Sequence, residues 1–176
     1  THVYGAKGYH HSTVEQIIDV AGVSRPTFYR YFKNKHEAID AVVKNLCGKL
    51  VSSIVEHALE ARNISQMFEY GVDAYFKWGS EIGVVAGSIY HEIYDSQSPA
   101  SRHRSLIIAE ILGMLERSKR LSGADLDSHL LDALLHVVEQ VGHQAFWPTK
   151  KDKREVNRLK ETILTITGSS LRMTAR

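Results

Sequence analysis

Residues 12–35 read STVEQIIDVAGVSRPTFYRYFKNK, and this stretch decides the fold of the N-terminal part of the chain. Ser12, followed three residues later by Glu15, is a capping-box pattern, which predicts that a helix begins at this point. Apolar residues then recur at helical spacing as far as Ala21. Gly22 follows them and gives the backbone the freedom that a sharp helix end requires. The first part of the stretch is therefore predicted to be a short helix that ends in a tight turn.

A second short helix is predicted directly after this turn. Ser24 is a suitable N-cap, and Pro26 falls in the first turn, where its missing N–H costs nothing because that donor has no intrahelical acceptor. Phe28 and Phe32 are four residues apart and share one face, which we expect to pack against the rest of the domain. Two helices joined by a glycine turn form a helix-turn-helix arrangement, so the other face of the second helix is the candidate for contacting a partner.

That other face carries the chemistry of a DNA-recognition helix. Arg25 presents a guanidinium fork that can bind a guanine edge or a phosphate, and Thr27 offers a hydroxyl and a methyl group. Tyr29 and Tyr31 can reach phosphate oxygens. Because the cationic side chains would bind phosphates, binding should weaken as the salt concentration rises. The residues that we predict to contact DNA in the major groove are Thr13, Arg25, Pro26, Thr27, Tyr29, Tyr31 and Lys35.

The run from Thr13 to Lys35, with its AGVS turn and TFYRYFKNK sequence, resembles the TetR family of transcriptional regulators. The resemblance implies an all-α homodimer in two domains: an N-terminal three-helix helix-turn-helix DNA-binding domain, residues 1–48, and a larger helical-bundle domain, residues 49–176, for effector binding and dimerisation. It further implies double-stranded operator DNA as a partner and a dimer interface built from the last two helices. A dimer would place two recognition helices about 34–36 Å apart, or a multiple of that, on a near-palindromic operator.

The composition fits a folded DNA-binding protein. Of the 176 residues, 43% are hydrophobic, which is enough for a core. The formal net charge is only +2, but residues 1–50 hold seven Lys and Arg against four Asp and Glu, so the positive excess lies on the predicted DNA-binding part. The charge pattern therefore supports the helix-turn-helix interpretation, although the excess is modest.

Cysteine usage and hydropathy bear on the compartment. Cys47 is the sole cysteine, which excludes an intrachain disulfide and a cysteine-based zinc site and favours a reducing cytoplasm. No apolar run approaches the roughly 20 residues needed to cross a bilayer, so we expect a soluble protein without a membrane partner. Because the sequence opens on Thr1 rather than Met, we expect the natural chain to begin upstream, with residues 1–8 as the remnant of a first helix.

The helical pattern continues through the rest of the chain. Asn34 with Glu37 is another capping box, and apolar residues at three-and-four spacing then predict one long helix, residues 35–61, that connects the two domains. The same signals predict a helix from Asn63 that is interrupted at Gly79 and Ser80. They also predict a helix begun by Ser98 and Pro99, whose section 106–115 lies in the middle of a bundle, and then a loop over residues 121–125. Two last helices are predicted over residues 125–145 and 152–171, the second capped by Thr149 and Asp152.

The larger domain carries many large aromatic side chains, and apolar pockets with a few polar tips are typical of small-molecule sites. We expect most of these rings in the core and about a third of them in a pocket lining. The predicted effector is a small apolar or aromatic molecule. The residues that we predict to bind it are Tyr70, Tyr75, Trp78, Tyr90, Tyr94, Phe146 and Trp147.

Two histidine-carboxylate groupings could orient a ligand or hold a metal. One joins His91 to Glu92 and Asp95, and the other places His143 four residues after Glu139. Each falls short of a metal-ligand set, so we favour ordinary polar roles for them and predict neither a metal nor a cofactor.

Three classes of protein fit an all-helical chain. A carboxylate-bridged di-iron enzyme would need Glu-x-x-His pairs on two helices, which this sequence lacks, so we predict that the protein is not an enzyme. A helical protein-interaction module would have no use for Arg25, Tyr29 and Lys35 on an exposed face. We therefore expect a dimeric repressor that a small effector releases from its operator, with a ligand-free or an activating regulator of the same fold as the alternative.

Overall fold

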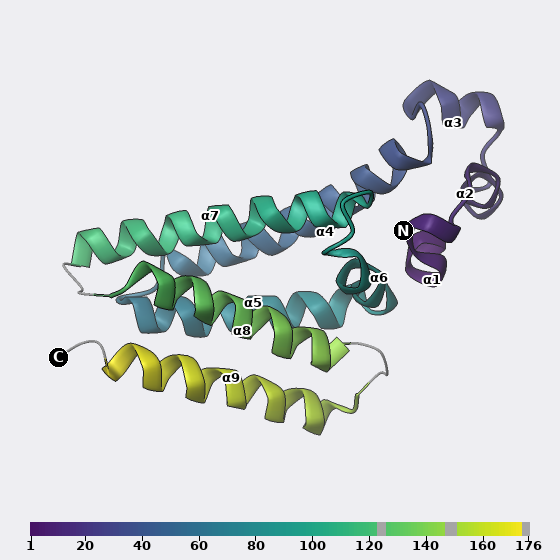
Figure 1. Ribbon diagram of the computed structural model, residues 1–176. Coiled ribbons are helices and arrows are strands. Elements are labelled where there is room, and N and C mark those ends of the chain that lie inside the picture. The colour runs from purple at the N-terminus through teal and green to yellow at the C-terminus, as the bar shows by residue number, and fades with distance from the viewer. Residues whose placement is uncertain (123–125, 147–150, 174–176) are drawn as a thin grey trace.

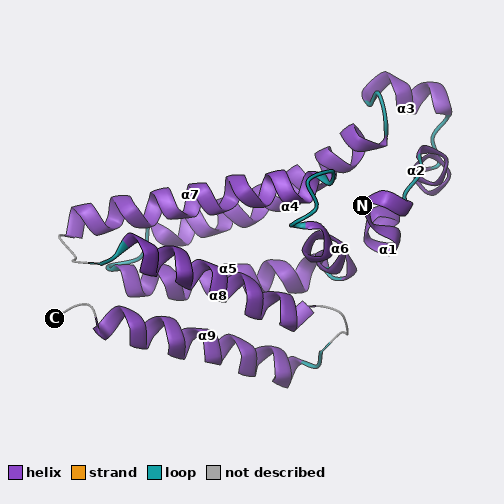
Figure 2. Ribbon diagram, in the orientation of Figure 1, coloured by secondary structure: helices purple, strands orange, loops and turns teal. Residues whose placement is uncertain are grey.

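A computed structural model describes residues 1–122, 126–146 and 151–173, and the regular structure of these residues is entirely helical (Figure 2). The predicted all-α class is therefore confirmed. The helices in chain order are α1 (His2–His11), α2 (Val14–Ala21), α3 (Arg25–Tyr31), α4 (Lys35–Ala58), α5 (Ile64–Ile82), α6 (Val84–Glu92), α7 (Pro99–Ser122), α8 (Ser128–Phe146) and α9 (Lys153–Met173).

The helices form a small N-terminal group and a larger bundle (Figure 1). α1, α2 and α3 lie at one end, and α4 runs from them into the bundle, where it packs against α5 and α7. α4 is continuous across residues 48 and 49, where the domain boundary was predicted. α6 lies at the end of the bundle nearest α1 and packs against it. Within the described ranges, no helix is long and apolar enough to span a membrane.

The cap of α2 lies one residue from its predicted position. The prediction that Ser12 caps this helix is wrong, because the N-cap is Thr13. The Thr13 hydroxyl accepts the N–H of Gln16 at 3.3 Å, and the Gln16 side-chain oxygen accepts the N–H of Thr13 at 3.2 Å. Ser12 is only 1% exposed, and its hydroxyl donates to the Gly8 carbonyl. Since both residues carry a hydroxyl, it was the burial of Ser12 against α1 that decided which of them caps.

The caps predicted at Ser24, Asn34 and Asn63 are confirmed. Each side-chain oxygen accepts the N–H of the residue three positions later, at 3.3, 3.0 and 2.9 Å respectively. α7 begins at Pro99 as predicted. Asp152 accepts the N–H of Glu155 at 2.8 Å and so caps α9, whereas Thr149 lies outside the described residues.

Two predictions about helix breaks are wrong. The interruption expected at Gly79 and Ser80 does not occur, because α5 continues to Ile82 and ends at Gly83, where φ is +57°. Gly79 instead makes room for a ring: a Cβ built there would lie 2.3 Å from Cε2 of Phe146. The loop expected over residues 121–125 is wrong at residues 121 and 122, which belong to α7, and residues 123–125 lie outside the described residues.

The expectation that residues 106–115 lie in the middle of a bundle is also wrong. Leu106 is 57% exposed, whereas Leu115 is 3% exposed. α7 packs one side against α4 and α8 and leaves the other side to the surface. The run of apolar residues therefore overstates how much of this helix is covered.

Candidate nucleic-acid interface and effector cavity

The turn between α2 and α3 sets the helix-turn-helix geometry. Gly22 lies in the left-handed region with φ +64°, which favours a residue without a Cβ. The N–H of Val23 donates to the Ile18 carbonyl at 3.3 Å, and this bond satisfies an acceptor at the end of α2. The Ser24 cap then starts α3 two residues after the glycine. The turn thus fixes the direction of α3 relative to α2.

α3 has one anchored face and one exposed face. Phe28 is 4% exposed, and its ring centroid lies 5.6 Å from that of Phe32. Away from the buried Phe28 ring, Tyr29 is 47% and Tyr31 is 67% exposed. Arg25 at the start of the helix is exposed as well. We call Arg25, Tyr29 and Tyr31 the recognition face.

The recognition face is linked to neighbouring charged side chains. The Arg25 guanidinium forms an ion pair with Glu15 on α2, and both side chains are more than half exposed. A backbone hydrogen bond and the nearby Arg25 guanidinium hold the pKa of the Glu15 carboxyl below its usual value. Arg30, which the sequence reasoning missed, places its guanidinium 5.0 Å from the centre of the Tyr31 ring and donates to its hydroxyl at 3.3 Å. Because exposed ion pairs are weak, Arg25 can exchange Glu15 for a phosphate at little cost.

The other residues predicted to contact DNA are divided by the structure. Thr13 and Pro26 are exposed, and Thr27 is half-buried, so all three are reachable from the α3 side. Lys35 is different, because its ammonium donates to the backbone carbonyls of residues 9, 10 and 12 at 2.9, 3.1 and 3.0 Å. These bonds engage all three N–H donors and place a cation at the C-terminal end of α1, where the helix dipole favours it. The geometry thus leaves Lys35 no free donor for a phosphate.

A cavity of about 110 Å³ lies within the bundle, between α4, α5, α6, α7 and α8. On α4 its lining extends from Cys47 to Ala58, which corresponds to about 16 Å along the helix axis. The walls are mainly aliphatic and aromatic side chains, such as Leu50, Ile107 and Met67. The lining therefore follows α4 over about three turns, and an extended apolar chain can lie along it.

Three of the predicted ligand-binding residues line this cavity: Tyr75, Trp78 and Tyr90. Tyr70 lies outside it, with its ring centroid 6.4 Å from that of His57. Tyr94 is 73% exposed, and Phe146 packs against α5 at Phe76. Trp147 lies outside the described residues. Similar aromatic side chains therefore serve as lining, core and surface, and the sequence alone did not separate them.

Sequence reasoning missed the charged pair in the cavity wall. Arg104 on α7 donates through Nε and Nη2 to the two carboxylate oxygens of Glu139 on α8, both at 2.6 Å. The hydrogen bond to Glu139 raises the pKa of the Arg104 guanidinium. The two residues are 35 positions apart on different helices, so no local spacing could have signalled the pair. Among the described residues, no three His, Cys, Asp or Glu side chains come together to hold a metal.

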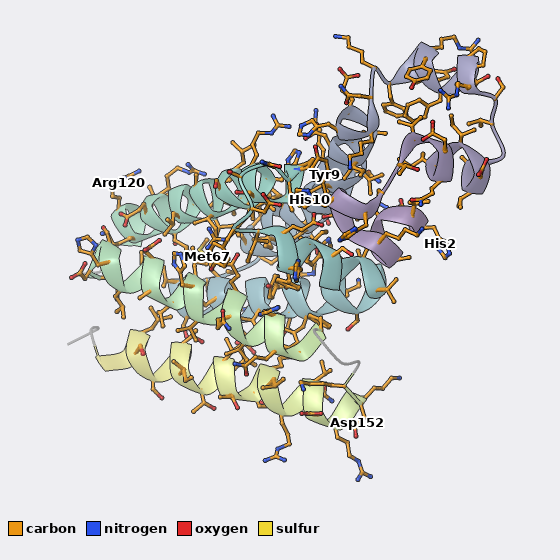
Figure 3. All side chains as sticks on the ribbon, turned by 45° about the vertical axis from the view of Figure 1, so that its right-hand side comes forward. His2, Tyr9, His10, Met67, Arg120 and Asp152 are labelled. Carbon is orange, nitrogen blue, oxygen red and sulfur yellow. The ribbon has the colours of Figure 1, made fainter. Side chains whose placement is uncertain are left out.

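A second polar cluster joins α1 to α6. The buried Glu92 carboxylate accepts the Tyr4 hydroxyl at 3.0 Å, the Tyr9 N–H at 2.6 Å and the Ser98 hydroxyl at 2.7 Å. His10 contacts Asp95 at 2.5 Å in the same region, and Figure 3 shows Tyr9 and His10 where α1 meets the larger bundle. The carboxylates named beside His91 in the sequence therefore connect the two domains.

The surface of α2 and α3 and the cavity in the bundle together define a class of protein. In this class, a helix-turn-helix domain is joined, here through α4 and α6, to a helical bundle with an internal cavity. Residues 1–42 match the family model described as bacterial regulatory proteins, tetR family. The N-terminal part of the chain is therefore similar to the TetR family of bacterial regulatory proteins.

One curated relative and two solved structures extend the comparison. The HTH-type transcriptional activator FasR of Mycolicibacterium smegmatis is 32% identical over 74 residues, which cover 42% of this chain and 34% of that protein. The chain thus matches about a third of the length of this relative. The fatty acid degradation regulator FadR of Bacillus halodurans has a TM-score of 0.77 at 20% identity, covering 97% of this chain and 91% of the other. FadR of Bacillus subtilis, solved in complex with stearoyl-CoA, has a TM-score of 0.72 at 20% identity, covering 99% and 92%. The described chain therefore has the fold of TetR-family regulators.

Proposed function

We propose that this chain is a transcriptional regulator that binds double-stranded operator DNA through α3. The observation that carries the proposal is the division of α3 into a buried side at Phe28 and the exposed recognition face. A helix divided in this way can enter the major groove while the rest of its domain holds it in place. Thr13, Pro26 and Thr27 extend the proposed contact surface, whereas Lys35 stabilises α1.

The proposed effector is a molecule with a long apolar chain. The apolar lining, which follows α4 from Cys47 to Ala58, supports this choice, and a protein of the same fold was solved with stearoyl-CoA. We propose that such an effector lowers operator affinity, so that the protein acts as a dimeric repressor. The activating alternative has its own support, since the relative FasR is named an activator.

The proposed signal passes from the cavity to the DNA-binding domain through α6 as well as α4. Ile89 and Tyr90 on α6 line the cavity, while Ser88 and Glu92 on the same helix bind α1. A ligand that shifts α6 would therefore move α1. Such a shift needs only that the ligand bind two conformations with different affinity.

The proposed dimer forms through α8 and α9. α9 lies at the edge of the bundle away from α4 and α7, with α8 beside it (Figure 1). Ile166 on α9 is 40% exposed and offers apolar surface to a partner. A two-fold dimer would present two α3 helices to a near-palindromic operator.

The DNA-binding proposal is tested by selecting duplexes from a random pool with the purified protein and then measuring their affinity by fluorescence anisotropy. Arg25→Ala should weaken binding of the selected duplex about tenfold or more, because a fork contact to a base or phosphate is lost. Arg62→Ala is the matched control, since it removes an exposed arginine from the segment between α4 and α5, outside both α3 and the proposed dimer interface. Unchanged affinity of Arg25→Ala, or failure to enrich any duplex at moderate salt, would overturn the proposal.

A further inference from the structure

We infer that the cavity selects an uncharged acyl compound, such as an ester or thioester, over an ionised fatty acid, with Arg104 and Glu139 as the residues that determine this specificity. The inference rests on the proposed acyl effector and adds the charge state of the end that carries the carbonyl group. It follows from how the charges in the cavity wall are paired.

Arg104 and Glu139 are the charged residues in the described lining, and they neutralise each other. Both carboxylate oxygens are bound by the guanidinium, through two 2.6 Å hydrogen bonds. The side chains are only 17% and 13% exposed, so water screens the pair weakly. The pair therefore adds polarity to the wall of the cavity without adding net charge.

The other polar groups in the lining are uncharged. The Tyr90 hydroxyl donates to the Tyr75 hydroxyl, which in turn donates to the Glu139 backbone carbonyl at 3.4 Å. Burial raises the pKa of both tyrosines, so each keeps its proton at neutral pH. Burial also raises the pKa of the Cys47 thiol to about 12, which keeps it protonated as well. The described lining thus contains no uncompensated positive charge for a carboxylate.

An ionised carboxylate in this cavity would be an unpaired charge in apolar surroundings. Losing water without gaining a counter-charge is costly, and displacing Glu139 from Arg104 would leave that carboxylate unpaired instead. A carbonyl oxygen needs only a hydrogen bond, and Arg104 has N–H groups that its two bonds to Glu139 do not use. The paired arginine can therefore serve a neutral carbonyl but not a second anion.

The pair also lies where a head group could leave the cavity. The Arg104 guanidinium carbon is 4.9 Å from the centre of the Tyr94 ring, and Tyr94 is 73% exposed. Its neighbours in the lining farther along α7 are Ile107, Ile108 and Ile111. This order places the carbonyl end of the ligand near the surface and its chain along the isoleucines.

The test compares dodecanoate with methyl dodecanoate at pH 8, below their aggregation limits, by titration calorimetry on the full chain. Quenching of the fluorescence of Trp78, which lines the cavity, gives a second readout. The wild-type protein should bind the ester at least about tenfold more tightly than the ionised acid. Equal affinity for the two probes, or preference for the acid, would overturn the inference while leaving the acyl effector in place.

A variant then tests the role of the pair itself. Glu139→Gln removes the neutralising charge at nearly constant volume, so dodecanoate should gain about tenfold or more in affinity while the ester changes little. Asp73→Asn is the matched control, because it removes a carboxylate that pairs with Lys160 outside the cavity lining. An unchanged acid-to-ester ratio in Glu139→Gln would show that the pair does not set the preference. If neither probe binds wild-type protein, the proposed acyl effector is itself wrong.

Discussion

The recognition face and the cavity inside the bundle are built in opposite ways. α2 and α3 each begin at a local side-chain cap, and the groups proposed to act are exposed. In the cavity the groups proposed to act are largely buried, and partners such as Arg104 and Glu139 come from different helices. An exposed helical surface can thus form through interactions between residues that are close in sequence, whereas a cavity depends on how distant segments pack.

The largest expected loss of stability distinguishes the buried ring that holds α3 in place from the exposed rings proposed to contact DNA. Phe28→Ala removes the most buried ring of α3 and should lower the free energy of unfolding by about 3–5 kcal/mol, as measured by urea denaturation. Tyr29→Ala, which removes an exposed ring from the same helix, should cost much less stability. Equal destabilisation by both variants would show that α3 is not anchored on one side.

In the larger bundle, adding a methyl group next to a residue that lines the cavity should be destabilising. A Cβ on Gly142 would lie 2.2 Å from the Tyr75 ring, so Gly142→Ala should cost about 1–3 kcal/mol through overpacking. It should also weaken the binding of methyl dodecanoate, because Tyr75 lines the cavity. Denaturation and calorimetry check the two effects, and a stable variant with unaltered ester binding would contradict the expected clash.

Lys35 distinguishes a structural cation from a DNA-binding one. Lys35→Met leaves backbone carbonyls at the end of α1 without their donors, which should lower stability by about 1–2 kcal/mol. Among folded molecules, the salt dependence of binding to the selected duplex should not change, because an ammonium held by three backbone carbonyls has no donor left for a phosphate.

The control for this variant is Lys33→Met, since the Lys33 side chain is 87% exposed. It should leave stability nearly unchanged. If Lys35→Met instead flattens the salt dependence and keeps full stability, Lys35 contacts phosphate after all.

The smallest expected effect is a gain in stability. Gly48 lies within α4, and a Cβ built there meets nothing within 4 Å. Gly48→Ala should therefore raise the free energy of unfolding by about 0.5–1 kcal/mol, because alanine favours the helix over the unfolded chain. Thermal denaturation of Gly48→Ala and Gly142→Ala, measured side by side, shows at which of the two positions a glycine is required for close packing. A destabilised Gly48→Ala would mean that α4 must bend there.

The parts that could be predicted are those governed by neighbours along the chain. The caps at Ser24, Asn34 and Asn63 were found because a side-chain oxygen reaches only the N–H groups of the next turn. The error at Ser12 shows the limit of this rule, since two adjacent hydroxyls satisfied the pattern and burial chose between them.

The parts that could not be predicted depend on contacts across the fold. Gly79 resembled a helix breaker, but the approach of Phe146 explains why a glycine stands there. Glu92 and Glu139 were noticed only as neighbours of histidines, whereas one joins α1 to α6 and the other pairs with Arg104. These roles are set by side chains that are distant in sequence, so no periodic pattern records them.

The sequence by itself determined that this chain is helical, that residues 12–35 form two short helices around Gly22, and which side of the second helix is apolar. Each of these features is decided within a few residues, by caps, glycine conformation and helical period. Only the tertiary structure decided that Lys35 binds the backbone carbonyls at the end of α1, and which aromatic rings line the cavity. It also decided that the two charged side chains in the cavity wall, Arg104 and Glu139, neutralise each other. Those outcomes depend on where whole helices pack against one another, because a hydrogen bond or a ring contact forms only once the distant partner is in place.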